Sequence, residues 1–194
     1  MEGSVGSMGR LLDHHPFETW PATGRKGLAW GLAALALVVS AALLLIGTQL
    51  REGGLVALEL ARSHERVAEI LASWEARGAL GLGAFGLGLD MLYLVAYGLL
   101  LSFAAAVIAA SARARGATTL ATAGVFAAWM ALVAAALDVF ENAFQVPYFA
   151  DPTAGVPGAV ASFAALKFML LGYVIAVSVA GAILNRRARP LSAA

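Results

Sequence analysis

Four long apolar runs constrain the fold of this chain more than any other feature of its sequence. They cover residues 27–50, 79–110, 119–146 and 159–184, and each exceeds the roughly 20 residues that a helix needs to cross a bilayer. A helix is suited to lipid because it satisfies its backbone hydrogen bonds within itself. The sequence therefore predicts an all-α integral membrane protein with four transmembrane helices in an antiparallel bundle.

The composition agrees with a membrane protein. Of the 194 residues, 61% are hydrophobic and 13% are charged, whereas soluble domains have roughly 45–50% apolar and 25% charged residues. The formal net charge of +1 argues against a nucleic-acid partner, and the lipid bilayer is the partner that the composition predicts. Because the chain has no cysteine, disulfides, thiolate metal sites and a cysteine nucleophile are excluded.

The chain divides into three parts by polarity. Residues 1–26 are expected to form a polar N-terminal tail, residues 27–184 a single transmembrane domain, and residues 185–194 a basic C-terminal tail. The pair His14-His15 is interpreted as part of a solvated tail, because no further metal-ligating residues lie near it in the sequence.

The segment between the first two spans has a different character. Over residues 55–77, apolar residues recur at helical spacing and charged residues fill much of the rest, which predicts one amphipathic surface helix. Alternatively, this helix is broken near Ser63. The charged residues of the segment, Glu59 among them, are assigned to a solvated face without chemistry.

Basic residues favour one orientation in the membrane. With four spans, both tails and the turn 111–118 lie on one side, and that side carries eight of the 13 basic residues. These eight are Arg10, Arg25, Lys26, Arg113, Arg115, Arg186, Arg187 and Arg189. The positive-inside rule then places both termini in the cytoplasm. Eleven arginines against two lysines, with abundant alanine and glycine, are typical of a GC-rich bacterium, so we expect a bacterial inner membrane.

Polar side chains interrupt three of the four spans. They are Asp90, Tyr93 and Tyr97 in the second span, Asp138, Glu141 and Asn142 in the third, and Lys167 in the fourth. Ionisable groups inside a membrane are costly, rarely face lipid and usually have a partner. Counted at about 1.5 Å per residue from the span ends, Asp90, Asp138 and Lys167 lie roughly 18, 14 and 15 Å deep. We therefore predict that Asp90, Asp138, Glu141 and Lys167 form one buried layer, in the membrane half away from the cytoplasm. All seven residues are predicted to belong to one polar cluster.

The formal charge of this predicted layer is unbalanced. Three carboxylates share one lysine, so at least one acid is protonated or a cation is bound. The sequence predicts that Asp138 or Asp90 pairs with Lys167 and that Glu141 exchanges the proton.

Three functions are compatible with such a layer. The first is a structural or accessory subunit of a membrane complex, in which buried ion pairs fix the helix register. The second is a proton- or cation-linked binding or transport site, for which a chain of four spans would need to form a homo-oligomer. The third is an enzyme acting on a lipid, with the carboxylates as acid and base or as Mg²⁺ ligands. The sequence assigns no catalytic residue, cofactor or metal site.

Short motifs add a resemblance. The order Ile70-Leu71-Ala72-Ser73-Trp74, Asp90-x-x-Tyr93-x-x-x-Tyr97, Asp138-x-x-Glu141-Asn142 and Lys167 resembles a group of uncharacterised four-span bacterial membrane proteins. The resemblance covers roughly residues 27–184. It implies four spans and the polar cluster, and it brings no established activity.

Overall fold

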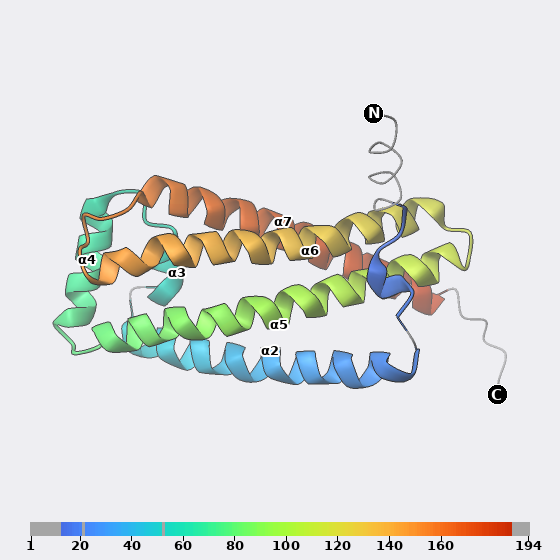
Figure 1. Ribbon diagram of the computed structural model, residues 1–194, viewed down its shortest axis with the longest axis horizontal. Helices are drawn as coiled ribbons and strands as arrows, with labels where there is room; N and C mark the ends of the chain where they lie inside the picture. Colours follow the sequence, from blue (N-terminus) through green and yellow to red (C-terminus); the bar gives the residue numbers. More distant parts are fainter. Residues whose placement is uncertain (1–12, 21, 52, 188–194) are drawn as a thin grey trace, which may run out of the picture.

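The computed structural model describes residues 13–20, 22–51 and 53–187, and every element in these ranges is helical (Figure 1). The elements are η1 (Pro16–Glu18), α2 (Ala22–Leu50), α3 (Gly54–Glu59), α4 (His64–Glu75), α5 (Leu80–Arg113), α6 (Thr118–Gln145), η2 (Val146–Phe149) and α7 (Pro157–Arg187). The all-α prediction is confirmed.

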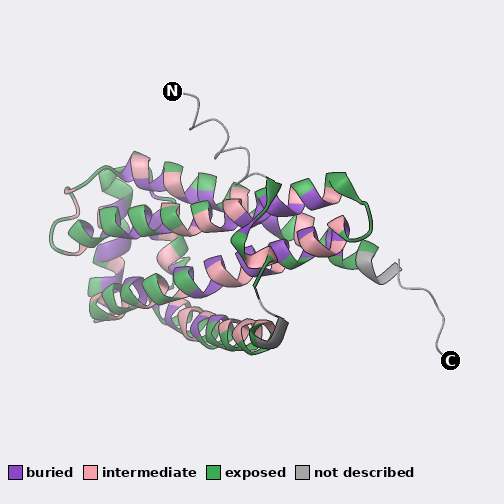
Figure 2. Cartoon of the chain, turned by 45° about the vertical axis from the view of Figure 1, so that its right-hand side comes forward, coloured by how far each residue is buried: buried purple, intermediate pink, exposed green. Residues whose placement is uncertain are grey.

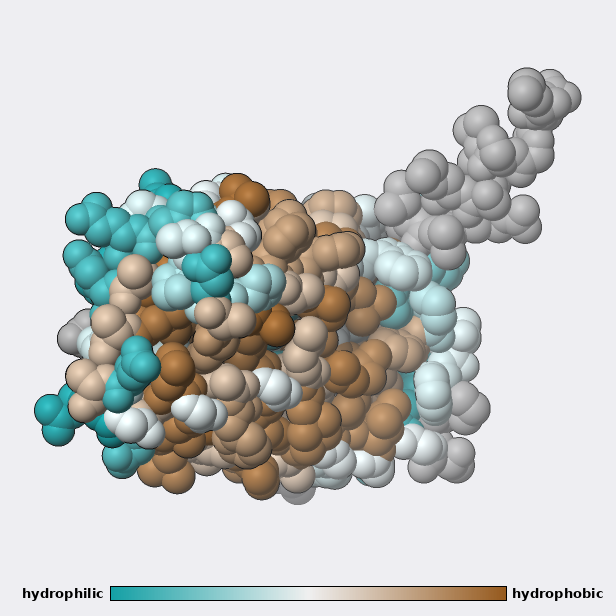
Figure 3. All heavy atoms as spheres, turned by 60° about the vertical axis from the view of Figure 1, so that its left-hand side comes forward, coloured by the Kyte–Doolittle hydropathy of each residue, from teal (hydrophilic) through white to brown (hydrophobic). Residues whose placement is uncertain are grey.

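Four helical segments are long and apolar enough to cross a membrane. They are Gly24–Leu50, Leu80–Arg113, Thr118–Phe149 and Pro157–Leu184. The four predicted spans are therefore confirmed, and the chain is a multi-pass membrane protein by the length and composition of its helices. In Figure 3 a broad apolar belt covers the middle of the molecule and hydrophilic residues gather toward its ends, as a bilayer requires.

Small residues bring the long helices into close contact. A Cβ atom added at Gly98 of α5 would lie 2.7 Å from the Cβ of Ala135 in α6, and one at Gly124 would lie 3.0 Å from that of Ala109. Such sites allow helices to pack closely within lipid, where van der Waals contact replaces the hydrophobic effect. The buried residues accordingly line the inward faces of the bundle (Figure 2).

The first span lies at the edge of the bundle. In an apolar stretch of 18 residues, 11% of α2 is buried, against 50% of the corresponding stretch of α5, and α2 packs alongside α5 (Figure 1). Its outer face exposes Leu37, Val38, Leu44 and Leu45. This helix therefore has a large surface for lipid.

The segment between α2 and α5 differs from the prediction of a single amphipathic helix over residues 55–77. It forms two helices, α3 and α4, separated by residues 60–63. The α4 helix begins where the Ser63 hydroxyl accepts a hydrogen bond from the backbone N–H of Arg66, at 3.2 Å. Because this cap starts a new helix, the break near Ser63 is real. In Figure 1, α4 lies across one end of the bundle and α3 lies further in, among the long helices.

The turn into α3 depends on left-handed backbone. Arg51, Gly53 and Gly54 have φ angles of 59°, 90° and 59°, a region that glycine adopts without steric cost. A Cβ at Gly54 would also lie 3.1 Å from the Cα of Gly47 in α2. The chain can therefore leave α2 and turn back closely against it, which directs α3 into the bundle.

The other end of the bundle holds the N-terminal segment 13–20. Its His15 is only 2% exposed, which corrects the interpretation of this histidine as part of a solvated tail. The imidazole packs edge-on against Trp129, with the ring centroids 4.6 Å apart, and Nε2 lies 3.4 Å from the hydroxyl of Ser102. Burial lowers the pKa of His15 below its ordinary value, an effect that nearby Glu18 partly opposes.

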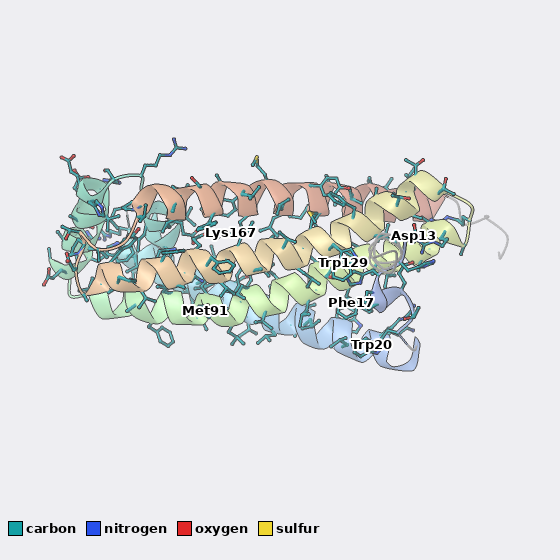
Figure 4. The ribbon with its side chains drawn as sticks, turned by 45° about the horizontal axis from the view of Figure 1, so that its top comes forward. Asp13, Phe17, Trp20, Met91, Trp129 and Lys167 are labelled. Atoms are coloured by element: carbon teal, nitrogen blue, oxygen red, sulfur yellow. The ribbon has the colours of Figure 1, made fainter. Side chains whose placement is uncertain are left out.

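An ion pair holds the same segment in place. The Glu18 carboxylate pairs with Arg113 of α5 and accepts the backbone N–H of His15 at 2.8 Å. Arg113 also donates to the carbonyl oxygen of Asp13, at 2.6 Å. One carboxylate and one guanidinium thus join residues 13–20 to the bundle, and Figure 4 shows Asp13 and Phe17 near its end.

Candidate functional site

Lys167 of α7 lies at the centre of a buried group of charged side chains, between α7 and α6 in Figure 4. Its Nζ atom is 2.8 Å from Oδ1 of Asp138, 2.9 Å from Oε2 of Glu141 and 3.3 Å from Oε2 of Glu59. All four side chains are less than 10% exposed. Three carboxylates from α3 and α6 therefore surround one ammonium group inside the bundle.

Helix geometry explains how α6 presents two of these acids. Asp138 and Glu141 are three residues apart, so both face the same side of α6, toward α7. The four-carbon stem of Lys167 is long enough to carry its ammonium group from α7 to that face while packing against apolar neighbours. The pairing with Lys167 thus follows from the register of two adjacent helices.

Polar neighbours donate hydrogen bonds to three of the acids, Asp90, Asp138 and Glu141. The Tyr97 hydroxyl donates to Oδ2 of Asp138 at 2.7 Å, and Nδ2 of Asn142 donates to Oδ2 of Asp90 at 2.8 Å. Nε2 of Gln145 donates to Oε1 of Glu141 at 3.2 Å. These contacts link α5 and α6 to the same cluster.

The structure brings most of the seven predicted residues together, but not equally. Asp138 and Glu141 both contact Lys167, whereas the hydrogen bond found for Asp90 comes from Asn142. Tyr97 is buried and bonded to Asp138. Tyr93 is half-buried and touches the cluster through its ring, whose centroid is 5.2 Å from that of Tyr97.

Glu59 belongs to the cluster, which corrects its assignment to a solvated face. It is 7% exposed and contacts Lys167 from a helix of only six residues, too short to show a periodic pattern. Burial raises the pKa of Glu59, while Lys167 acts to lower it. A signal was present: Glu59 stands alone in the apolar stretch Leu55–Ala61, unlike the alternating charges of α4.

The acids outnumber the base. The cluster has a formal charge of −3 when every group is ionised. The four negative charges are those of Glu59, Asp90, Asp138 and Glu141, and the positive charge is that of Lys167. Neighbouring carboxylates in a poorly solvated interior disfavour each other's ionised forms. Protons or cations must therefore offset part of this charge.

Two amide side chains suit both protonation states of their acids. Asn142 and Gln145 are fully buried, each donates to one carboxylate, and the amide oxygens Oδ1 and Oε1 lack a hydrogen-bond partner. An amide turned by 180° offers an acceptor instead of a donor, and the two orientations are assigned from the network. The amide beside Asp90 and the amide beside Glu141 can therefore donate a hydrogen bond to the ionised carboxylate or accept one from the protonated carboxylic acid.

A cavity of about 790 Å³ lies against the charged cluster. Its lining includes Glu59, Asp90, Asp138 and Lys167, together with hydroxyl groups and apolar side chains. The hydroxyl groups come from Ser40, Thr48, Tyr93 and Tyr97, and the apolar wall includes Leu43, Leu44, Leu55, Val56, Leu101, Phe168, Leu171 and Ile175. A mostly apolar pocket with a few charged groups in its lining is typical of ligand sites.

The arrangement can hold a proton or a cation and can bind a small molecule beside it. Within the described part of the chain, no three His, Asp or Glu side chains are grouped to hold a metal ion. Membership of the uncharacterised four-span group stays a prediction. No family model, curated protein or solved structure matches this chain.

Proposed function

We propose that this membrane protein provides a proton- or cation-linked binding or transport site. The observation that carries the proposal is the single lysine among four carboxylates, set against a cavity of about 790 Å³. A cluster with surplus acid can take up a proton or cation and release it when a ligand changes the local charge. A fully balanced ion pair has no such capacity.

The hydrogen bonding of the surplus acids supports the same function. Asp90 and Glu141 each contact an amide that can donate to the ionised form or accept from the protonated form. Proton exchange then requires rotation of a side chain instead of a rearrangement of helices. Because the cluster is coupled through Lys167, its protons belong to the group and not to one residue.

The proposal includes a location and an orientation in the membrane. The composition, rich in arginine, alanine and glycine, favours a bacterial inner membrane, and the charge distribution of the loops favours both termini in the cytoplasm. The cluster then lies in the membrane half away from the cytoplasm, where α3 and α4 lie. Alternating access usually needs more than four spans, so transport would involve a homo-oligomer.

One observation favours a second function. Lys167 already contacts three carboxylates, so the cluster also suits an accessory subunit whose ion pairs fix helix register for partner subunits. That function predicts that the paired change Asp138→Asn and Lys167→Met is tolerated and that the cluster exchanges neither a proton nor a cation with solution. A lipid-modifying enzyme would use the same acids, with Asp90 at the cavity as acid or base.

Infrared spectroscopy of the protein in lipid nanodiscs tests the proposal directly. We expect a protonated carboxyl band at neutral pH, or sodium binding that replaces it, and loss of this signal in Glu141→Gln or Asp90→Asn. The matched control is Glu65→Gln, which neutralises an exposed acid of α4. A wild-type protein with no protonated carboxyl and no bound sodium would refute the proposal and favour the accessory-subunit function.

A further inference from the structure

The cavity beside the cluster is polar at one end and apolar at the other. Along α5 its wall runs from Asp90 through Tyr93 and Tyr97 to Leu101, which spans about 16 Å at 1.5 Å per residue. Along α7 it runs from Lys167 to Ile175 in the same direction, because both helices lead away from the α3–α4 end. A ligand that fits must therefore have a polar head and an apolar body.

The apolar wall reaches the surface that faces lipid. It includes Leu44 of α2, which is 72% exposed, and Phe168 of α7, which is 42% exposed. The apolar wall of the cavity is therefore continuous with exposed apolar side chains of α2 and α7. An amphiphile can thus reach the site from within the membrane.

The polar end favours a positive head group. Three carboxylates and one ammonium line the cavity, so its wall has a formal charge of −2. Asp90 lies at this wall outside the group of three carboxylates that hold Lys167, and its bond to the neutral amide of Asn142 leaves its charge uncompensated. The rings of Tyr93 and Tyr97 stand one and two turns away, and aromatic faces attract cations.

We infer that the ligand is a lipophilic amine, an ammonium group on an apolar body without a phosphate. The inference rests on the proposed function and names its substrate class. The ammonium group contacts the Asp90 carboxylate, and the apolar body lies between Leu43 and Leu44 of α2 and Leu171 of α7. A phosphate or sulfate head would meet the surplus acids and be repelled.

Binding is linked to a proton through Asp90. The ammonium ion requires the ionised carboxylate, so its arrival releases to solution any proton that Asp90 holds, and the charge of the site is unchanged. The other charged or titratable groups at the cavity wall come from four helices, and α2 contributes none. They are Glu59 on α3, Tyr93 and Tyr97 on α5, Asp138 on α6 and Lys167 on α7. Affinity for a permanent cation should therefore rise with pH.

The test measures binding of tritiated dodecyltrimethylammonium to the full chain in phosphatidylcholine nanodiscs, with empty nanodiscs subtracted. This cation does not titrate, so any dependence on pH belongs to the protein. We expect saturable binding, with release of a proton, and weakening by at least about tenfold in Asp90→Asn, as for loss of a partly buried charge partner. Dodecanol and dodecyl sulfate should fail to compete.

Matched variants separate the site from general effects on folding. Leu171→Trp fills the cavity and should weaken binding by a similar factor, whereas Met169→Trp, on the exposed side of the same helix, should not. Asp151→Asn neutralises an exposed loop acid and is the control for Asp90→Asn. Circular dichroism and size-exclusion profiles show which variants fold.

Each failure has a distinct meaning. Binding that is unchanged in both Asp90→Asn and Leu171→Trp, or equal competition by dodecyl sulfate, overturns the amine site. The protonated carboxyl band can persist in that case, and the proposed function then stands without its ligand class. Saturable binding that releases no proton and does not vary with pH instead supports the amine site and refutes the proton link.

Discussion

At one end of the bundle, Glu59 joins the short helix α3 to Lys167, and at the other end Glu18 joins residues 13–20 to Arg113. Both contacts attach a non-spanning segment to the long helices by an acid–base pair. Arg113 is 35% exposed and shares its charge with one carboxylate and the backbone oxygen of Asp13. Lys167 is 5% exposed and is shared among three carboxylates.

This difference indicates that the Glu18–Arg113 pair anchors a segment, whereas the cluster around Lys167 is a candidate binding site. The pair at the N-terminal end is balanced and lies near water, so it can hold a segment in place without a third species. The cluster at the α3–α4 end is buried and has surplus acid, so it needs a proton or cation to be neutral. Burial alone does not distinguish the two ends, because Glu18 is also only 4% exposed. The ratio of acidic to basic groups distinguishes the two ends.

The largest expected effect tests the unbalanced end. Lys167→Met removes the ammonium group that three buried carboxylates share and should destabilise the protein by about 3–5 kcal/mol, the usual cost of breaking a buried pair. Unfolding in mixed micelles, followed by circular dichroism, measures the change. Adding Asp138→Asn and Glu141→Gln should restore much of the loss. If Lys167→Met alone is as stable as the wild type, the cluster is not held by charge.

A smaller loss is expected at the balanced end. Glu18→Gln breaks the pair with Arg113 and should cost about 1.5–3 kcal/mol, as for a hydrogen bond to a charged group. Because Arg113 is partly exposed, added salt should reduce the difference from wild type. The same unfolding titration at two ionic strengths checks this, with Glu65→Gln as the exposed control.

Removal of an acid from the unbalanced end should have less effect. Glu59→Gln keeps the shape of the side chain and reduces the surplus negative charge, so we expect a change within about 1 kcal/mol. A loss larger than that of Glu18→Gln would mean that Glu59 acts as an anchor, and the contrast between the two ends would fail. Both variants belong in one unfolding series.

The smallest expected effect concerns His15. Its pKa is lower in the folded chain than the ordinary value of 6.5, so the unfolded chain binds the proton more readily. Stability is therefore fully present above pH 6.5 and decreases as the pH falls through that value toward the folded pKa. Unfolding free energies at several pH values, compared with those of His15→Gln, should show a shallower pH dependence in the variant.

The sequence was sufficient to predict the four spans and part of the polar cluster. Long apolar runs predicted four helices because lipid leaves few alternatives, and polar residues such as Asp138 and Lys167 stood out against that background. The contact of Lys167 with both Asp138 and Glu141 depends on the relative rotation of α6 and α7. A periodic pattern gives the face of each helix but not its partner.

Other features lay beyond a local pattern. Glu59 and Lys167 are 108 positions apart, and α3 is too short for its buried face to be read from periodicity. His15 sits in a polar segment whose burial depends on contact with Trp129 and Ser102 of other helices. In both cases the environment of the side chain is set by tertiary contact and not by its neighbours in sequence.

The left-handed turn at Gly53 and Gly54 has a consequence for biosynthesis. A ribosome completes this turn and α3 long before it makes Lys167, so Glu59 has no counterion while the earlier spans enter the membrane. The short helix should therefore stay undocked until the last span is inserted. Since the chain has no native cysteine, a single Leu58→Cys label can report this: nascent chains arrested before α7 should react with a water-soluble maleimide, and released chains should be protected.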